Sequence, residues 1–275
     1  SFAAQVATAN FDWYVLEISS FMLDNMYQFR ADVSVLLNIT PDHLDRYDYK
    51  MENYAASKMR IIQNQTAADT FIYSADDEET AKLIKKHQII PQTLPFSIHH
   101  KIEMGAYLED QTIHINVPNK EPFTMSISDL ALQGKHNLYN SMASGIVAKV
   151  LELRNDTIRQ SMGNFKNIEH RLEFVAKISD VTYINDSKAT NARLAVESIN
   201  SVDAEIVLIL GGDDLKTDYS WFTNINYYNI KTVIYYGRRF AEIKNIFNKH
   251  VMVIVADNLE SAVEVSKAKA IKNKA

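Results

Sequence analysis

The chain has 275 residues, of which 47% are hydrophobic and 23% are charged, and its formal net charge is −5. This composition is typical of one large or two ordinary globular domains, and the acidic balance argues against nucleic acid or an anionic membrane surface as a partner. The absence of cysteine excludes disulfides, thiolate zinc sites and a cysteine nucleophile. No apolar run approaches the roughly 20 residues of a membrane span. We therefore expect a cytoplasmic protein with no membrane partner, and a monomer.

The first third of the sequence alternates between buried strands and helices. The nearly continuous apolar runs 13–21 and 31–40 predict strands that are covered on both faces, which is typical of a parallel sheet. Residues 70–75 predict a third strand, and residues 79–87 a helix after it. Between 95 and 129 the pattern alternates, with turns at 109–110 and 118–119, and predicts antiparallel hairpins. A helix over 134–153 follows, with Asn137 as its expected cap.

The α/β alternation restarts around 167–172. Residues 174–178 and 181–187 predict a strand pair, 191–201 a helix, and 204–212 a buried strand that ends in glycines. Two further strands, 231–237 and 250–256, are each followed by a helix. We predict an α/β fold with two domains, 1–167 and 168–275: a central parallel sheet with antiparallel hairpins, then a Rossmann-like α/β domain.

Two side chains of the first domain are candidate metal ligands. Glu17 lies near the carboxyl end of the predicted strand 13–21, the end at which open parallel sheets bind ligands, although an acid there can also pair with a base. Thr40 is a good helix cap and Pro41 fits the first helical position, so we expect His43 in the first turn, at the same edge of the sheet. A histidine beside such a glutamate is a candidate ligand.

Lys58 lies on a predicted helix face with Tyr54, Ala55, Ile61 and Ile62. A lysine there buries its stem and must reach water or meet a partner. A third possibility is that a buried amine with a lowered pKa reacts with carbon dioxide to give a carbamate, an oxygen ligand that suits magnesium.

Polar residues also follow the strands of the second domain. Asp186, Lys188 and Thr190 in "YINDSKATN" could hold a ribose, a phosphate or an acidic substrate; alternatively, Asn185 or Asp186 caps the following helix. Lys216 is the cation in "LGGDDLKTDYS", and Arg171 lies near the domain boundary. No glycine-rich P-loop motif occurs anywhere in the sequence.

Several of these motifs together resemble the Mur ligases. The segments that carry the resemblance are "VLEISSF", "NITPDHLDRY", "YAASKMRI", "GKHNLYN", "EHRLEFV" and "INDSKATN", which occur in the family's order over nearly the whole chain. The motif "DSKATN" points to the branch that adds D-glutamate. By comparison with the family, we expect that the uridine-nucleotide-binding domain, the P-loop and the last strands lie beyond the given sequence, and that this chain alone is inactive.

The resemblance implies an ATP-dependent ligase that joins D-glutamate to UDP-N-acetylmuramoyl-L-alanine through an acyl phosphate, in cytoplasmic peptidoglycan precursor synthesis. It implies magnesium as the cofactor, ATP as co-substrate and the following roles for residues of this chain. Glu17, His43 and a carbamylated Lys58 would hold the metal, and Asn137 and Asn140 would contact adenine. Arg171 and Asp186 would face the phosphates and ribose, and Lys188, Thr190 and Lys216 would bind substrate.

Other functions remain open on the sequence alone. One is another Mur ligase or a ligase similar to folylpolyglutamate synthetase. A second is a nucleotide- or partner-binding module without catalysis. A third is a metal-dependent phosphohydrolase that uses Glu17, His43 and neighbouring acids.

Overall fold

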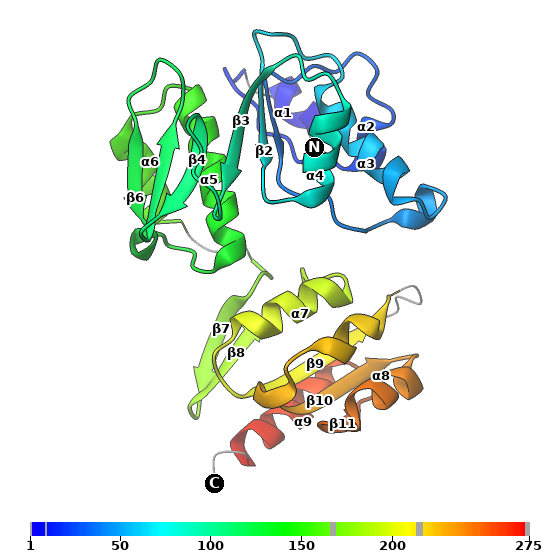
Figure 1. Ribbon diagram of the computed structural model, residues 1–275. Coiled ribbons are helices and arrows are strands. Elements are labelled where there is room, and N and C mark those ends of the chain that lie inside the picture. Colours follow the sequence, from blue (N-terminus) through cyan, green and yellow to red (C-terminus); the bar gives the residue numbers. More distant parts are fainter. Residues whose placement is uncertain (1, 9, 166–168, 213–216, 273–275) are drawn as a thin grey trace. The chain divides into compact units, whose positions relative to one another are not determined.

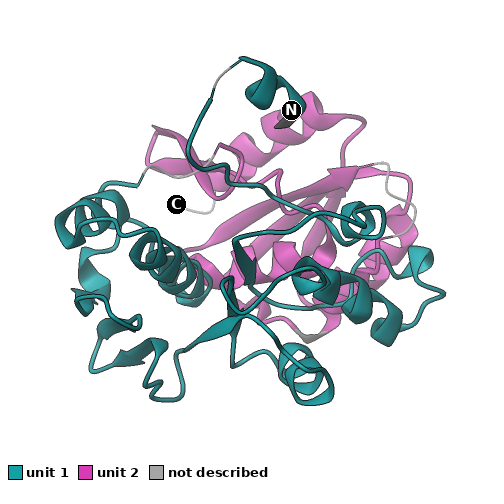
Figure 2. Ribbon diagram, turned by 90° about the horizontal axis from the view of Figure 1, so that it is seen from above, with its two compact units in different colours: residues 1–165 teal, residues 166–275 magenta. Residues whose placement is uncertain are grey.

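The structure divides into two compact units, Ser1–Phe165 and Lys166–Ala275 (Figure 2). It is a computed structural model that describes residues 2–8, 10–165, 169–212 and 217–272. The division falls beside the boundary predicted between 167 and 168. Within the described residues, no helix is long and apolar enough to cross a membrane.

Unit 1 is a six-stranded sheet in the order β1-β2-β3-β4-β5-β6, with helices around it (Figure 1). Its strands are β1 (Val33–Leu36), β2 (Thr70–Ser74), β3 (Gln92–Ser97), β4 (Gly105–Glu109), β5 (Thr112–Asn116) and β6 (Phe123–Ser126). Its helices are α1 (Phe2–Thr8), α2 (Ser20–Leu23), α3 (Met51–Met59), α4 (Glu78–Lys86), α5 (Lys135–Val150) and α6 (Asn155–Gly163), with 3-10 turns η1 (Leu44–Arg46), η2 (Arg60–Ile62) and η3 (Ile127–Asp129). The pairs from β1 to β4 are parallel, and those from β4 to β6 are antiparallel. This confirms the predicted α/β fold with a mostly parallel sheet.

The sheet of unit 1 is covered on two faces, as the apolar runs predict. In β2, Ile72 packs into the cluster that contains Met142 and Ile146 of α5, while Phe71 packs with Tyr54 of α3 on the other side. Successive strand residues point to opposite faces, so a continuous apolar run is what a strand between two helical layers requires.

Unit 2 contains a three-stranded parallel sheet and a separate antiparallel pair. Its strands are β7 (Glu173–Ile178), β8 (Val181–Asn185), β9 (Ile206–Gly212), β10 (Ile230–Gly237) and β11 (Met252–Val255); its helices are α7 (Ala192–Ser201), α8 (Phe240–Phe247) and α9 (Leu259–Lys272), with 3-10 turns η4 (Tyr219–Asn224) and η5 (Tyr227–Asn229). The three-stranded order is β11-β10-β9, and β7 pairs with β8. In β10, Val233 and Tyr235 pack into the cluster with α8, whereas Ile234 packs with Ala262 of α9. Helices therefore lie on both faces of the sheet (Figure 1).

Three local predictions are wrong. Residues 13–19 form no strand, and Val15 is 95% exposed; an apolar run becomes a strand only where another strand's free edge pairs with it. Thr40 caps no helix: the chain turns at His43, with φ of 50°, into η1, and α3 begins only at Met51. Asn137 is not the cap of α5, because Gly134 holds that position and the Asn137 amide donates to the Gln133 carbonyl.

An ion pair between the exposed Arg30 and the buried Asp69 fixes the entry to β1 and β2. Asp69 has a buried side chain, and its two oxygens accept hydrogen bonds from Arg30 Nε and Nη2 at 2.9 and 2.7 Å. The Thr66 amide and hydroxyl also donate to Asp69, at 2.6 and 2.9 Å. The hydrogen bond from Arg30 leads the effects that lower the pKa of Asp69 to about 2. A folded-state pKa below that of the unfolded chain means stability that is present above about pH 4 and is lost as the pH falls toward 2.

We expect Asp69→Asn to make unit 1 less stable near neutral pH and to reduce the loss of stability between pH 4 and pH 2. The change removes a carboxylate that is charged in the folded state, and with it the linkage to protons. Urea unfolding at several pH values, followed by circular dichroism, measures both effects. The matched control is Asp110→Asn in the exposed turn between β4 and β5. An unchanged pH dependence in Asp69→Asn would contradict the assignment.

Candidate functional site

The loop after β1 brings His43, Asp42 and Lys58 into one region of unit 1. The His43 amide donates to Asp42 Oδ1 at 2.9 Å, and His43 Nε2 lies 3.8 Å from Asp42 Oδ2. The Asp42 carboxylate also acts electrostatically on Lys58, opposing the effect of burial on the lysine pKa. In the structure Asp42 is therefore an acid whose charge lies close to His43 and also acts on Lys58.

Lys58 is half-buried, on the face of α3 that the sequence predicts. Its ammonium nitrogen lies 5.0 Å from the ring centroid of Tyr54, which is buried. Burial lowers the pKa of Lys58, while the charge of Asp42 works in the other direction. Burial, with smaller effects from Asp42 and Tyr47, also raises the pKa of Tyr54 to about 12. Compared with an exposed lysine, the surroundings therefore increase the fraction of neutral amine, the form that can react with carbon dioxide.

Hydrogen bonds hold α2 against α3 beside this lysine. Ser57 is buried, and its hydroxyl donates to Asp24 Oδ1 at 2.6 Å and to the Ser20 carbonyl at 2.9 Å. Tyr47 donates to the other Asp24 oxygen at 2.8 Å. Docked in this way, α2 places Phe21 edge-on to the His43 ring, with centroids 5.8 Å apart.

Glu17 is exposed, in the irregular segment before α2. It lines a shallow groove together with Gln5, Tyr14 and Met22. Because 13–19 is not a strand, the prediction that Glu17 lies at a strand's carboxyl end is wrong, although its role as a ligand is a separate question. Among the residues that the structure describes, no three His, Cys, Asp or Glu side chains are grouped to hold a metal ion.

The side chains near Lys58 suit magnesium only if Lys58 itself carries a carbamate. A protonated lysine is not a ligand, and His43 and Asp42 offer one imidazole and one carboxylate. A carbamate on Lys58 would add a second oxygen donor of the hard type that magnesium prefers. The half-buried amine fits this requirement because its pKa is lowered.

In unit 2, hydrogen bonds bring the segments of Arg171, Asp186 and Lys188 together. Asp186 Oδ1 accepts from the Leu172 amide at 2.9 Å, and the Lys188 amide donates to the His170 carbonyl at 2.9 Å. His170 and Leu172, on either side of Arg171, have φ of 67° and 46°. Such left-handed backbone is uncommon for these residue types and persists where surrounding contacts hold it.

The turn after β8 presents polar groups outward. Lys188 and Thr190 are exposed, and the Thr190 amide donates to the Lys188 carbonyl at 2.9 Å. The cap of α7 is Asn191, which accepts from the Leu194 amide, rather than Asn185 or Asp186. Asp186 is therefore used to fasten the Arg171 loop. Lys216 lies outside the described residues.

The predicted adenine-contacting residues lie at the start of α5, in unit 1. Asn137 and Asn140 are three residues apart, and hence on one side of the helix. Both side chains are partly exposed. Between them lies Tyr139, which no sequence motif indicated and whose hydroxyl donates to Asp76 at 2.9 Å. The signal that could have found this contact is the pair Asp76-Asp77 directly after a buried strand.

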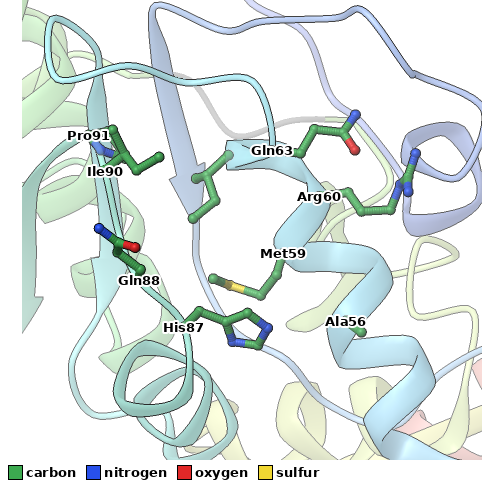
Figure 3. Close-up of a pocket in the computed structure, with 9 residues that line it drawn as sticks. Ala56, Met59, Arg60, Gln63, His87, Gln88, Ile90 and Pro91 are labelled. Carbon is green, nitrogen blue, oxygen red and sulfur yellow. The ribbon is translucent and has the colours of Figure 1, made fainter.

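A separate pocket of about 280 Å³ lies between α3, η2 and the segment before β3 (Figure 3). It contains none of the predicted site residues. Three of its polar side chains are within hydrogen-bonding distance of backbone carbonyls. Arg60 Nε donates to the Leu23 carbonyl, Gln63 donates to that of Met26, and His87 Nδ1 lies 3.0 Å from the carbonyl oxygen of Leu83. This pocket offers no cluster of reactive groups.

Comparisons with known proteins agree on one family. Residues 1–148 match the Mur ligase middle domain. A UDP-N-acetylmuramoylalanine--D-glutamate ligase of Christiangramia forsetii is 46% identical over 267 residues, covering 97% of this chain and 60% of that protein. The same-named ligase of Bacteroides fragilis is 41% identical over 273 residues, covering 97% of this chain and 61% of its own length. The chain thus spans about 60% of the length of these relatives.

The fold is also found in a solved structure of lower sequence similarity. The folylpolyglutamate synthase of Mycobacterium tuberculosis, complexed with ADP and AMPPCP, aligns with a TM-score of 0.65 at 16% identity, covering 88% of this chain and 58% of that one. This likeness concerns the fold alone. The domain match and the two relatives together show that the chain belongs to the Mur ligase family.

Proposed function

We propose that this chain serves the ATP-dependent addition of D-glutamate to UDP-N-acetylmuramoyl-L-alanine, a cytoplasmic step of peptidoglycan precursor synthesis. The observation that carries this proposal is the 46% and 41% identity, over 97% of the chain, to ligases named for that product. In the proposed reaction, the substrate carboxylate attacks the γ-phosphorus of ATP and ADP leaves. The D-glutamate amine then attacks the acyl phosphate, loses a proton, and phosphate leaves as the amide forms.

Residues of unit 1 would supply the metal and adenine contacts. Glu17, His43 and a carbamate on Lys58 would hold magnesium, which when bound reduces the repulsion between the phosphates and the attacking carboxylate. The half-burial of Lys58 and the lowering of its pKa support this role. Asn137 and Asn140 would contact adenine, since an asparagine amide can both donate to and accept from its edge.

Residues of unit 2 would bind the phosphates, the ribose and the amino acid. Arg171 and Asp186 would act on the nucleotide, and Lys188 and Thr190, with Lys216, on D-glutamate and the transferred phosphate. The hydrogen bonds that tie the Arg171 loop to the turn after β8 support a shared task for these residues. Two anions must meet in this reaction, so fixed cations lower the barrier.

We expect Lys58→Ala to lower ligation by roughly 100-fold or more, because it removes the group on which a charged oxygen ligand would form. A small added carboxylate should restore part of the activity. The assay is D-glutamate-dependent phosphate release by the full-length product of the gene. Lys50→Ala, an exposed lysine just before α3, is the control. In ¹³C-bicarbonate, a carbamate resonance should be present in the parent and absent from Lys58→Ala. Full activity of unrescued Lys58→Ala would refute the role.

We expect Lys188→Ala to reduce turnover by roughly 100-fold without unfolding unit 2, because Lys188 is exposed and its side chain supports no packing. The same phosphate-release assay measures turnover, and thermal unfolding measures stability. Lys177→Ala on β7 removes another exposed lysine of unit 2 and should leave turnover unchanged. Equal turnover in Lys188→Ala and the parent would rule out this assignment.

A further inference from the structure

Asp76 is an acid at the carboxyl end of β2 that the proposed reaction does not use. Three donors surround its carboxylate: the Ser97 hydroxyl at 2.6 Å, the Ile98 amide at 2.8 Å and the Tyr139 hydroxyl at 2.9 Å. Ser97 is the last residue of the neighbouring strand β3 and Ile98 follows it, whereas Tyr139 belongs to α5, 63 residues along the chain. One side chain therefore joins two adjacent strand ends to the first turns of a helix.

The N-terminus of α5 has no capping side chain, although Leu138 in its first turns packs into the core of unit 1. Its N-cap, Gly134, has φ of 96° and contributes no side-chain hydrogen bond to the free amides of the first turn. A helix end without a capping side chain is prone to fraying. The Tyr139 ring packs on Phe96 of β3 with centroids 6.1 Å apart, and its hydroxyl reaches Asp76. Tyr139 thus attaches this turn sideways to the sheet.

Asn137 and Asn140 lie on this same turn. In a helix, residues 137 and 140 share one side, whereas 139 points elsewhere. Tyr139 can therefore be held by the sheet while the two amides remain available. Asn137 uses one donor on the Gln133 carbonyl at 2.9 Å, which leaves its amide oxygen for a ligand.

The charges of Asp76 and Tyr139 do not change around neutral pH. Burial opposes ionisation of Asp76, but the hydrogen bonds from Ser97, Ile98 and Tyr139 outweigh it and lower the pKa of the carboxyl group. Burial and the bond to Asp76 raise the pKa of Tyr139. A charged acceptor and a neutral donor therefore persist together, and such bonds are stronger than those between neutral groups.

We propose that Asp76 is a positioning residue, which fixes the first turn of α5 through the Tyr139 hydroxyl so that Asn137 and Asn140 are held ready for the adenine base. This inference rests on the proposed function for what the turn binds. The competing role for an acid at this edge is direct contact with a metal or substrate. Three of the roughly four acceptor positions of the carboxylate are already filled by protein donors, which favours positioning.

The test compares Tyr139→Phe and Asp76→Asn with Tyr227→Phe. The control variant, like Tyr139→Phe, removes a hydrogen-bonded tyrosine hydroxyl. The Tyr227 hydroxyl lies in unit 2 and donates to the backbone carbonyl of Phe222. The first measurement is amide hydrogen exchange of residues 138–140 in the free chain, because the amides of residues 135–137 have no acceptor within the helix. We expect exchange there to be at least roughly tenfold faster in Tyr139→Phe and Asp76→Asn, and unchanged in Tyr227→Phe. The double variant should exchange no faster than the more affected single variant, because both changes act on the same hydrogen bond, the one between Tyr139 and Asp76.

The second measurement is binding followed by NMR, with adenosine and inorganic tripolyphosphate as separate probes. Adenosine should shift the side-chain amide signals of Asn137 and Asn140 and should bind several-fold more weakly to Tyr139→Phe. Tripolyphosphate has no base, so its binding should not change. A general loss of structure would weaken both probes, which separates that explanation from positioning.

The outcomes separate the two levels of inference. Unchanged exchange at 138–140 in Tyr139→Phe would overturn the positioning role, whatever binds there. Faster exchange with no adenosine effect on the two asparagines would leave the anchor in place and overturn the adenine assignment. Equal adenosine affinity of Tyr139→Phe and the parent, despite faster exchange, would show that the anchor does not serve binding and would also overturn the proposal.

Discussion

The turn Asp76-Asp77, which follows β2, is the constraint on which the proposed ligand-binding edge of unit 1 depends. Asp76 binds the ends of β3 and the start of α5, as described above. Asp77 Oδ2 accepts from the Ile39 amide at 3.2 Å, and from the amide and hydroxyl of Thr80 at 2.9 and 2.6 Å. It therefore caps α4 and also holds the chain where it leaves β1. Two adjacent carboxylates therefore hold the chain where it follows β1 and β3, the two neighbours of β2.

This constraint has a functional consequence because both proposed halves of the unit 1 site begin at these anchored points. The segment that Asp77 holds at Ile39 continues to Asp42 and His43, and the turn that Asp76 holds carries Asn137 and Asn140. Partly buried carboxylates with several donors are costly to rearrange, since each lost bond leaves a charge less well solvated. The loops of a parallel sheet can thus be ordered before any ligand arrives, which reduces the entropy lost on binding.

Unit 2 uses the same principle on a smaller scale. Its Arg171 loop contains two residues with left-handed backbone, and Asp186 and Glu173 accept the hydrogen bonds that hold it, from the amides of Leu172 and His170 at 2.9 and 2.8 Å. Asn185 adds a contact to the His170 ring at 2.8 Å. Asp186, which the sequence indicates as a candidate ribose ligand, also accepts a structural hydrogen bond from the Leu172 amide. The two roles are compatible because the second Asp186 oxygen remains available.

The sequence by itself determined the α/β class, the parallel strands and the hairpins, because these depend on the spacing of apolar and turn residues within a few positions. It also determined α4, where Asp77, two glutamates and two lysines mark the ends of one helix. The motif residues pointed to the family, and the half-buried position of Lys58 followed from the helical period. Only the tertiary structure decided that 13–19 is not a strand and that Gly134 rather than Asn137 caps α5. It alone revealed the hydrogen bond of Tyr139 to Asp76 and the electrostatic effect of Asp42 on Lys58, because such pairings depend on which chain segments pack together, and no local pattern records the distance between residues far apart in sequence.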